Sequence, residues 1–189
     1  ARHFNFKGCK MTKLRIVGLC GSLRAGSFNR RVMNLVADAM GDDVTFEEIR
    51  LDWPLFDGDV EASSGVPQVI DEAAQNIKAA DAVIIAAPEY NKGITGVLKN
   101  GLDWLSRTPH KPFAQKPVAF VSAAAGRTGG ETAHYMTKAC VMALGADIIS
   151  LPPVIIASVQ NEFDETGLTN ERYDTAIKAM AEALKTRLT

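Results

Sequence analysis

The sequence predicts an α/β sandwich, in which helices cover both faces of a five-stranded parallel sheet. Two observations support this prediction. Five short apolar runs alternate along the chain with five segments of helical periodicity. The run 82–87 is also apolar at every position, which is typical of a strand buried on both faces of a parallel sheet. At 189 residues the chain is long enough for one domain with a single sizeable core.

The expected strands and helices account for most of the chain. The strands are 14–20, 44–49, 82–87, 118–122 and 148–156, the last interrupted by Pro152 and Pro153. The helices occupy 28–39, 66–77, 94–105, 131–144 and 173–184, where apolar residues recur at helical spacing. Right-handed crossovers between parallel strands then favour the strand order 2-1-3-4-5. Residues 58–65 are the most loop-like stretch.

Residues 1–10 are predicted to be a non-native leader. They precede Met11 and lack the periodic pattern that begins after it. The remainder, 11–189, shows no repeat, low-complexity tract or linker that would divide it. We therefore expect a single domain over residues 11–189.

Charge and composition exclude several classes of partner. The formal net charge is -1 and the basic residues are scattered, whereas a nucleic-acid or membrane surface would call for a basic face. No apolar run approaches the roughly 20 residues that span a bilayer. The cysteines form neither a disulfide framework nor a zinc motif, and no other metal constellation is evident. We expect a cytoplasmic protein without a metal site.

Fold geometry and local sequence select the same place for a ligand. In an open parallel sheet, ligands bind beyond the carboxyl ends of the strands, where the strand order reverses. For the order 2-1-3-4-5 this place lies between the first and third strands. The loops that follow these strands, 21–29 and 88–93, are also the two most distinctive segments of the chain.

The loop 21–29 has the composition of an anion-binding site. Ser22, Ser27 and Asn29 offer side-chain donors, and Arg24 adds a charged fork of donors. The following helix contributes its N-terminal amides and dipole. The spacing fits neither a Walker loop nor a dinucleotide fingerprint, so a phosphate monoester is the expected ligand. The alternative is a serine-capped helix start beside an exposed arginine.

The loop after the central strand suits a planar heterocycle. Pro88 ends the strand, Tyr90 offers a flat aromatic surface, and Glu89 and Asn91 offer polar groups. Taken alone, this tetrapeptide is equally typical of an ordinary turn.

Together these segments resemble the NADPH-dependent FMN reductase family, in particular its bacterial quinone and chromate reductases. The residues that carry the resemblance are Gly21-Ser22-Leu23-Arg24, Ser27, Asn29, Pro88-Glu89-Tyr90-Asn91, Leu98-Lys99-Asn100 and Asp103-Trp104-Leu105-Ser106-Arg107. Their order and spacing are preserved from about Lys13 to the last helix. The resemblance implies a flavodoxin-like fold and FMN as the cofactor.

The resemblance also implies which residues bind FMN. The phosphate would be held by the side chains of Ser22, Arg24, Ser27 and Asn29 and by the amides of Leu23 and Phe28. The ribityl chain and ring would lie against Pro88, Glu89, Tyr90 and Asn91, with Lys92 at the rim. The loop 122–126, which contains Ala124, would close the far side of the flavin. Family members often carry tyrosine in place of Lys92 and serine in place of Ala124.

The implied activity is that of an FMN-dependent NAD(P)H oxidoreductase. It would reduce quinones or similar acceptors, among them chromate, azo compounds or free flavin, by ping-pong hydride transfer through the flavin N5. No catalytic side chain is required, and the histidines are expected to be structural or solvated. Arg127 is a candidate rim cation. Arg107 would contact an anionic acceptor or NAD(P)H, or would be a surface arginine at a helix C-terminus.

The family further implies a homodimer or homotetramer. Segment 52–56 places two aromatic residues beside the expected site, where they would pack either on a partner subunit or within the same chain. A flavodoxin-like electron carrier is the alternative to the enzyme. Such a carrier would bind FMN but oxidise NAD(P)H poorly, and it would typically be strongly acidic, unlike this near-neutral chain.

Overall fold

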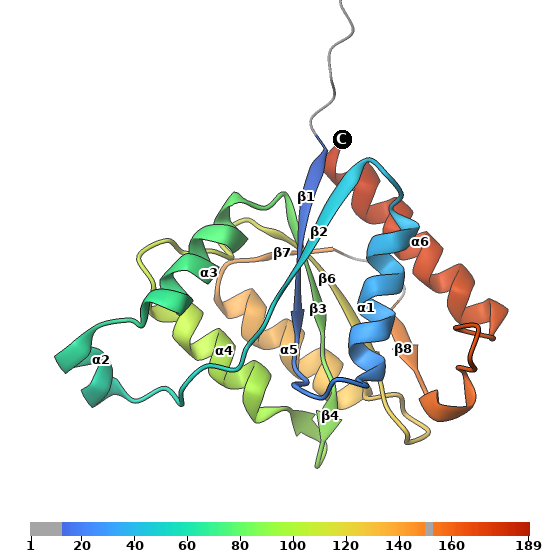
Figure 1. Ribbon diagram of the computed structural model, residues 1–189, viewed down its shortest axis with the longest axis horizontal. Coiled ribbons are helices and arrows are strands. Elements are labelled where there is room, and N and C mark those ends of the chain that lie inside the picture. Colours follow the sequence, from blue (N-terminus) through green and yellow to red (C-terminus); the bar gives the residue numbers. More distant parts are fainter. Residues whose placement is uncertain (1–12, 150–152) are drawn as a thin grey trace, which may run out of the picture.

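A parallel sheet forms the centre of the structure, a computed structural model that describes residues 13–149 and 153–189 (Figure 1). The expected leader, residues 1–10, lies outside the described residues. The strands of the sheet are β1 (Leu14–Cys20), β2 (Val44–Ile49), β3 (Ala82–Ala86), β6 (Pro117–Ala123), β7 (Asp147–Ile148) and β8 (Val154–Ile156). Their order is β2-β1-β3-β6-β7, with β8 also paired to β6. This arrangement confirms the predicted fold and strand order.

The fifth position of the sheet differs from the expectation in one detail. Instead of one strand over 148–156, two short strands pair with β6. β7 aligns Ile148 with Val118, and β8 aligns Ile155 with Ser122, both in parallel. Pro153 precedes β8 and has no N–H to donate to a ladder, which is consistent with a break before this residue. As a result, β8 runs beside the carboxyl end of β6 and delivers its own loop to the ligand edge.

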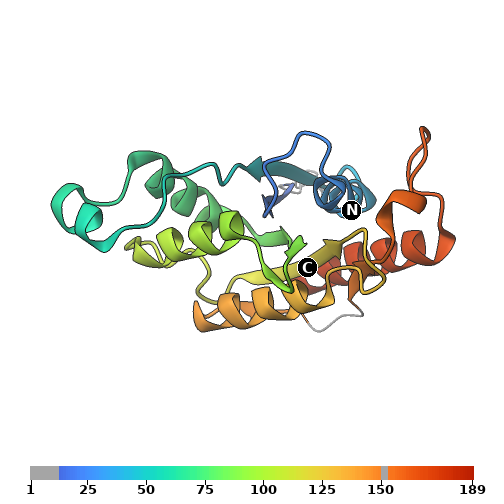
Figure 2. The same cartoon turned by 90° about the horizontal axis from the view of Figure 1, so that it is seen from below.

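Helices cover both faces of the sheet (Figures 1 and 2). One face carries α1 (Phe28–Ala39) and α6 (Glu171–Leu188), and the other carries α3 (Gln68–Ala79), α4 (Gly96–Arg107) and α5 (Glu131–Ala143). Strand alternation divides the core between them, because Ile84 joins the first cluster and its neighbours Val83 and Ile85 join the second. Both faces of β3 are therefore buried, as its uninterrupted apolar sequence predicts.

Residues 58–65, predicted to be loop-like, contain the short helix α2 (Gly58–Ser64). That prediction was wrong because local start and stop signals outweigh the small, polar composition of the segment. The Asp57 carboxylate accepts a hydrogen bond of 2.8 Å from the Asp59 amide, and Gly65 ends the helix with φ of 76°. Figure 1 shows α2 at the tip of an arm, residues 52–65, that extends away from the sheet.

The arm is attached to α4 by Asn100 and Trp104, two of the residues that carry the family resemblance. Trp104 is fully buried, as expected of a core residue, and its Nε1 donates to the Pro54 carbonyl at 2.8 Å. Asn100 donates to the same carbonyl at 2.9 Å and accepts from the Phe56 amide at 2.8 Å. The Phe56 ring meets Trp104 edge-on, with centroids 5.0 Å apart. These contacts hold the base of the arm against α4, and they therefore determine the direction in which the arm extends.

His134 is buried in the first turns of α5 without a hydrogen-bond partner for either ring nitrogen in the described part of the chain. Its ring packs edge-on against Phe120 of β6, with centroids 6.1 Å apart. Burial, assisted by the charge of Lys138, lowers the pKa of His134 to about 4. The ring is therefore neutral at pH 7 and acts as a packing group, which agrees with the structural role expected for it.

We predict that His134 makes the folded protein less stable as the pH falls below about 6.5. The unfolded histidine takes up a proton near its ordinary pKa of 6.5, whereas the folded one does so only near 4. Between pH 7 and pH 5 the unfolded state thus binds more protons, which costs about 2 kcal/mol of unfolding free energy. Urea denaturation at both pH values should show this decrease, and His134→Gln should largely abolish it. An equal pH dependence in the variant would contradict the assignment.

Candidate functional site

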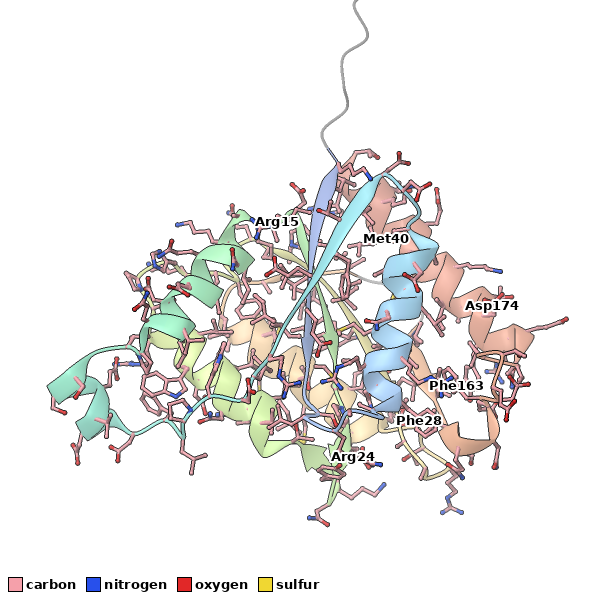
Figure 3. The ribbon with its side chains drawn as sticks, viewed as in Figure 1. Arg15, Arg24, Phe28, Met40, Phe163 and Asp174 are labelled. Carbon is pink, nitrogen blue, oxygen red and sulfur yellow. The ribbon has the colours of Figure 1, made fainter. Side chains whose placement is uncertain are left out.

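A pocket of about 450 Å³ opens at the carboxyl edge of the sheet. The loops that follow β1, β3, β6 and β8 all contribute to its wall. Figure 3 shows Arg24 and Phe28 at this edge, whereas Arg15, near the start of β1, lies at the opposite end of the sheet. The pocket is thus located where strand order reverses, between β1 and β3, and its size is typical of a small-molecule site.

The structure brings most of the sequence-predicted cofactor residues together. All of them except Leu23 and Asn91 line the pocket: Ser22, Arg24, Ser27, Phe28, Asn29, Pro88, Glu89, Tyr90, Lys92 and Ala124. Leu23 and Asn91 belong to the same two loops. Of the two arginines considered for substrate, Arg127 is exposed in the loop after β6, between the lining residues Gly126 and Thr128. Arg107 lies on α4 and pairs with the arm.

Close packing at the end of β1 fixes the first loop. The Gly21 amide donates to Ala86 of β3 at 2.9 Å, and the Gly21 carbonyl accepts from the buried Thr95 hydroxyl at 2.8 Å. A Cβ atom at position 21 would lie 2.8 Å from the Thr95 Oγ1 and 2.9 Å from the Pro88 Cδ. Only glycine therefore allows the loops after β1 and β3 to approach this closely.

Two polar residues predicted to bind phosphate also have structural partners. Ser27 is the N-cap of α1, where its Oγ accepts from the Arg30 amide at 3.4 Å. Asn29 donates to the Ala123 carbonyl at 2.7 Å and accepts from the Ala123 amide at 3.0 Å. Both ends of the Asn29 side chain are thus engaged with β6. Asn29 contributes to the pocket by fastening the loop 21–29 to the far wall.

The second loop is a tight hairpin between β4 (Glu89–Tyr90) and β5 (Gly93–Ile94). Its two central residues, Asn91 and Lys92, both have positive φ, 51° and 61°. This is the backbone of a type I′ turn, which matches the twist of a two-residue hairpin. The Tyr90 side chain remains 57% exposed, so a flat aromatic surface is presented at the mouth of the pocket.

Glu89 is held as a carboxylate. Its Oε2 accepts from the Ala133 amide at 3.2 Å, at the start of α5, and the Lys92 Nζ lies 3.3 Å from Oε1. Burial alone would raise the pKa of Glu89, but the amides of α5 and the Lys92 ammonium outweigh it and lower the pKa below its ordinary value. A carboxylate so engaged braces the hairpin against α5 and is poorly suited to act as a proton donor.

Sequence reasoning missed three lining residues, Thr128, Val159 and Gln160. Val159 and Gln160 lie in the short helix η1 (Val159–Asn161), which follows β8. Ligands bind beyond the carboxyl ends of the strands, and this rule applies to the fifth strand as well. It could therefore have predicted that the segment after β8 reaches the pocket. Gly129 brings the loop after β6 against β8, since a Cβ there would be 2.6 Å from the Ile155 Cγ2.

An aromatic contact supports the loop 21–29 from the side of η1. The Phe28 ring packs on Phe163 with centroids 5.4 Å apart, and the Arg31 guanidinium lies 4.2 Å from the Phe163 ring centroid. Figure 3 shows Phe28 and Phe163 side by side. The start of α1 is thereby held by a segment far along the chain.

Arg107 of α4 forms an ion pair with Glu61 of the arm. Its Nε lies 2.9 Å and 3.0 Å from the two carboxylate oxygens of Glu61 on α2. The structure therefore does not bring Arg107 to the pocket. It joins α4 to the tip of the arm, in line with the contacts of Asn100 and Trp104.

The arrangement suits an anionic group at one end and a planar group at the other. The anion would meet Arg24 and the N-terminal amides of α1, and the planar group would lie along the hairpin at Tyr90. In residues 13–149 and 153–189 no cluster of three or more His, Cys, Asp or Glu could hold a metal ion. No described helix is long and apolar enough to cross a membrane.

A flavodoxin-like sheet with a small-molecule pocket at its reversal point is typical of one class of protein, the α/β flavoproteins. The family of NADPH-dependent FMN reductases matches residues 14–161, and the chain belongs to this family. The family assignment confirms the resemblance derived from the two loops, and with it the FMN cofactor class.

Curated relatives match most of the chain. An NAD(P)H-dependent FMN reductase from Pseudomonas aeruginosa is 36% identical over 174 residues, which cover 91% of this chain and 94% of the relative. A quinone reductase from Escherichia coli K12 is 38% identical over 159 residues, covering 82% and 84%. Among solved structures, the flavoenzyme NAD(P)H:(acceptor) oxidoreductase FerB from Paracoccus denitrificans superposes with a TM-score of 0.79 at 23% identity, covering 92% and 98%.

Proposed function

We propose that this protein is an FMN-dependent NAD(P)H oxidoreductase that reduces quinones or similar small acceptors. One observation carries the proposal: the phosphate-type loop and the aromatic hairpin, remote in sequence, form opposite parts of one pocket at the reversal point of the sheet. The relatives from P. aeruginosa and E. coli, an NAD(P)H-dependent FMN reductase and a quinone reductase, support it.

Each part of FMN has matching groups in the pocket. The phosphate is assigned to Ser22, Arg24, Ser27 and the amides of Leu23 and Phe28, with Asn29 positioning the loop. The ring and ribityl chain are assigned to Pro88, Glu89, Tyr90 and Asn91, with Ala124 on the far wall and Lys92 at the rim. The donors at the phosphate end are buried hydroxyls, a guanidinium and a capped helix start, which is the donor set a dianion requires.

Bound FMN supplies the redox chemistry, accepting a hydride equivalent from NAD(P)H and passing electrons to the acceptor. The protein's own part is to hold and orient. The Gly21 packing and the hairpin fix the width of the pocket, and Glu89 keeps the hairpin against α5. The exposed face at Tyr90 leaves room for NAD(P)H and the acceptor to use the same space in turn. Lys92 and Arg127 offer positive charge to an anionic substrate at the rim.

A homodimer or homotetramer is part of this proposal. Leu55 is 84% exposed at the fixed base of the arm, and Val60 on α2 is 48% exposed. Apolar side chains on a rigid projection are expected to be covered by another subunit. A cytoplasmic location is also proposed, supported by the free thiols of Cys20 and Cys140.

The first prediction of this proposal concerns the absorbance of the protein loaded with FMN. NADPH added without oxygen should bleach the flavin band, and benzoquinone added afterwards should restore it. A yellow protein that does not respond to NADPH would indicate an electron carrier instead. A protein that gains no flavin when mixed with FMN would contradict the site itself.

The second prediction concerns Arg24. Arg24→Ala should weaken FMN binding by about 1.5–3 kcal/mol, since a charged hydrogen bond to phosphate is lost. Fluorescence titration of flavin into the FMN-free protein would measure this change. Arg187→Ala is a matched control, because it removes the same charge from an ion pair with Asp147 at the other side of the sheet. Equal affinities for Arg24→Ala and the control would remove Arg24 from the phosphate site.

The third prediction concerns the arm. Leu55→Asp should raise the dissociation constant of the oligomer about tenfold or more, because a charge would be buried in an apolar contact. Sedimentation velocity over a range of concentrations would detect it. Met142→Asp, at a side chain 63% exposed on α5, is the comparison variant. Dissociation by Met142→Asp alone would move the interface from the arm to α5.

A further inference from the structure

Arg30 lies in the first turn of α1 and binds the loop that precedes it. Its Nη2 donates to the Ser22 carbonyl at 2.8 Å, and its Nη1 donates to the Arg24 carbonyl at 2.5 Å. Its Nε lies 2.8 Å from both carboxylate oxygens of Glu48. One planar guanidinium thus joins α1 and β2 to the loop 21–29, which we call the phosphate loop because the FMN phosphate is assigned to it.

The hydrogen bonds of Arg30 determine which way the loop peptides face. A trans peptide is planar, so its N–H points opposite to its C=O. With the carbonyls of Ser22 and Arg24 directed at Arg30, the N–H groups of Leu23 and Ala25 are directed away from it. Ser22 and Arg24 line the pocket, whereas Arg30 is not a lining residue.

We propose that Arg30, oriented by Glu48, is a positioning residue that sets the phosphate loop with its amides toward the ligand and its carbonyls away from it. This inference rests on the proposed function, since the ligand is the FMN phosphate. Carbonyl oxygens facing a dianion would repel it, whereas a concave row of amides attracts it. Fixing the peptide orientation in advance spares the cofactor the cost of ordering the loop.

The charge of Arg30 is not the source of this effect. Glu48 neutralises it at 2.8 Å, and both side chains are largely shielded, with 17% and 21% of their surfaces exposed. We call the Arg30–Glu48 pair, with its hydrogen bonds to the loop, the clamp. Glu48 aligns with Gly18 in the β1–β2 register, so the clamp is anchored in the sheet. Lysine cannot replace it, because an ammonium lacks the flat fork that reaches two carbonyls and a carboxylate together.

The test compares FMN with riboflavin, which has no phosphate. Both flavins are titrated into FMN-free wild type, Arg30→Gln and Arg30→Lys, with flavin fluorescence as the readout. We expect FMN affinity to fall about tenfold in both variants, with riboflavin affinity within about twofold of wild type. An unchanged FMN affinity, or an equal loss for both flavins, would overturn the clamp. Full affinity in Arg30→Lys would show that charge alone matters.

Glu48→Gln separates geometry from charge by the sign of its effect. Removing the carboxylate leaves the Arg30 charge unneutralised, so a purely electrostatic role would tighten FMN binding. The clamp instead requires weaker binding, because Arg30 loses its orientation. Tighter binding in Glu48→Gln would therefore overturn the proposal.

Arg15→Gln is the matched control. Arg15 is also an arginine on the β1–β2 side that pairs with a glutamate of β2, Glu47 at 3.4 Å, but it lies at the opposite end of the sheet (Figure 3). It should leave FMN affinity at the wild-type level. A loss equal to that of Arg30→Gln would attribute the effect to net charge or general stability, against the clamp.

Amide hydrogen exchange of residues 21–27 in the flavin-free protein provides a readout independent of binding. Exchange in this loop should be faster in Arg30→Gln than in wild type, with β3 and β6 unchanged. Unchanged loop exchange would overturn the clamp even if affinity fell. Wild type that fails to bind FMN would reject the proposed function, whereas the exchange data would still decide whether Arg30 orders the loop.

Discussion

The end of β1 has no room for a side chain at Gly21, because Thr95, Pro88 and Leu98 approach it from two other segments. This crowding places the start of α4 and the loop after β3 directly against the loop after β1. The hydrogen bond from Thr95 to the Gly21 carbonyl then fixes the contact at 2.8 Å. The two loops that define the pocket are therefore held in one relative position by the packing of the sheet.

Two further hydrogen-bonded contacts hold the other walls of the pocket. Asn29 reaches across to Ala123, so the loop 21–29 is tied to the end of β6 at the rim of the pocket. Glu89 links the hairpin to the first turn of α5. Each link uses a polar side chain, Asn29 or Glu89, for which the sequence predicts contact with a ligand. The structure shows that positioning is the role their hydrogen bonds already serve.

Periodicity and loop chemistry predicted the sheet, its order and the two main loops, because these depend on local sequence. The contributions of Thr128 and Gln160 could not be read in the same way, since neither lies in a motif. Thr128 belongs to the loop after β6, and Gln160 reaches the pocket because β8 pairs with the end of β6. The partner of Asn29 lies 94 residues away, a distance that local patterns do not encode. Helix α2 was missed because two capping residues outweighed the composition of the segment.

The motif on α4 shows how a resemblance can be correct while the role of its residues is not evident. Arg107 was considered for substrate contact, yet it pairs with Glu61, and Asn100 and Trp104 bind the chain at Pro54. The pairing of Phe28 with Phe163 has a temporal consequence. A chain made from its N-terminus displays the phosphate loop early, but the ring that supports this loop is supplied 135 residues later (163 − 28 = 135). During synthesis, the start of α1 therefore lacks this supporting contact until residue 163 has emerged, so the loop 21–29 is expected to reach its final packing late in folding.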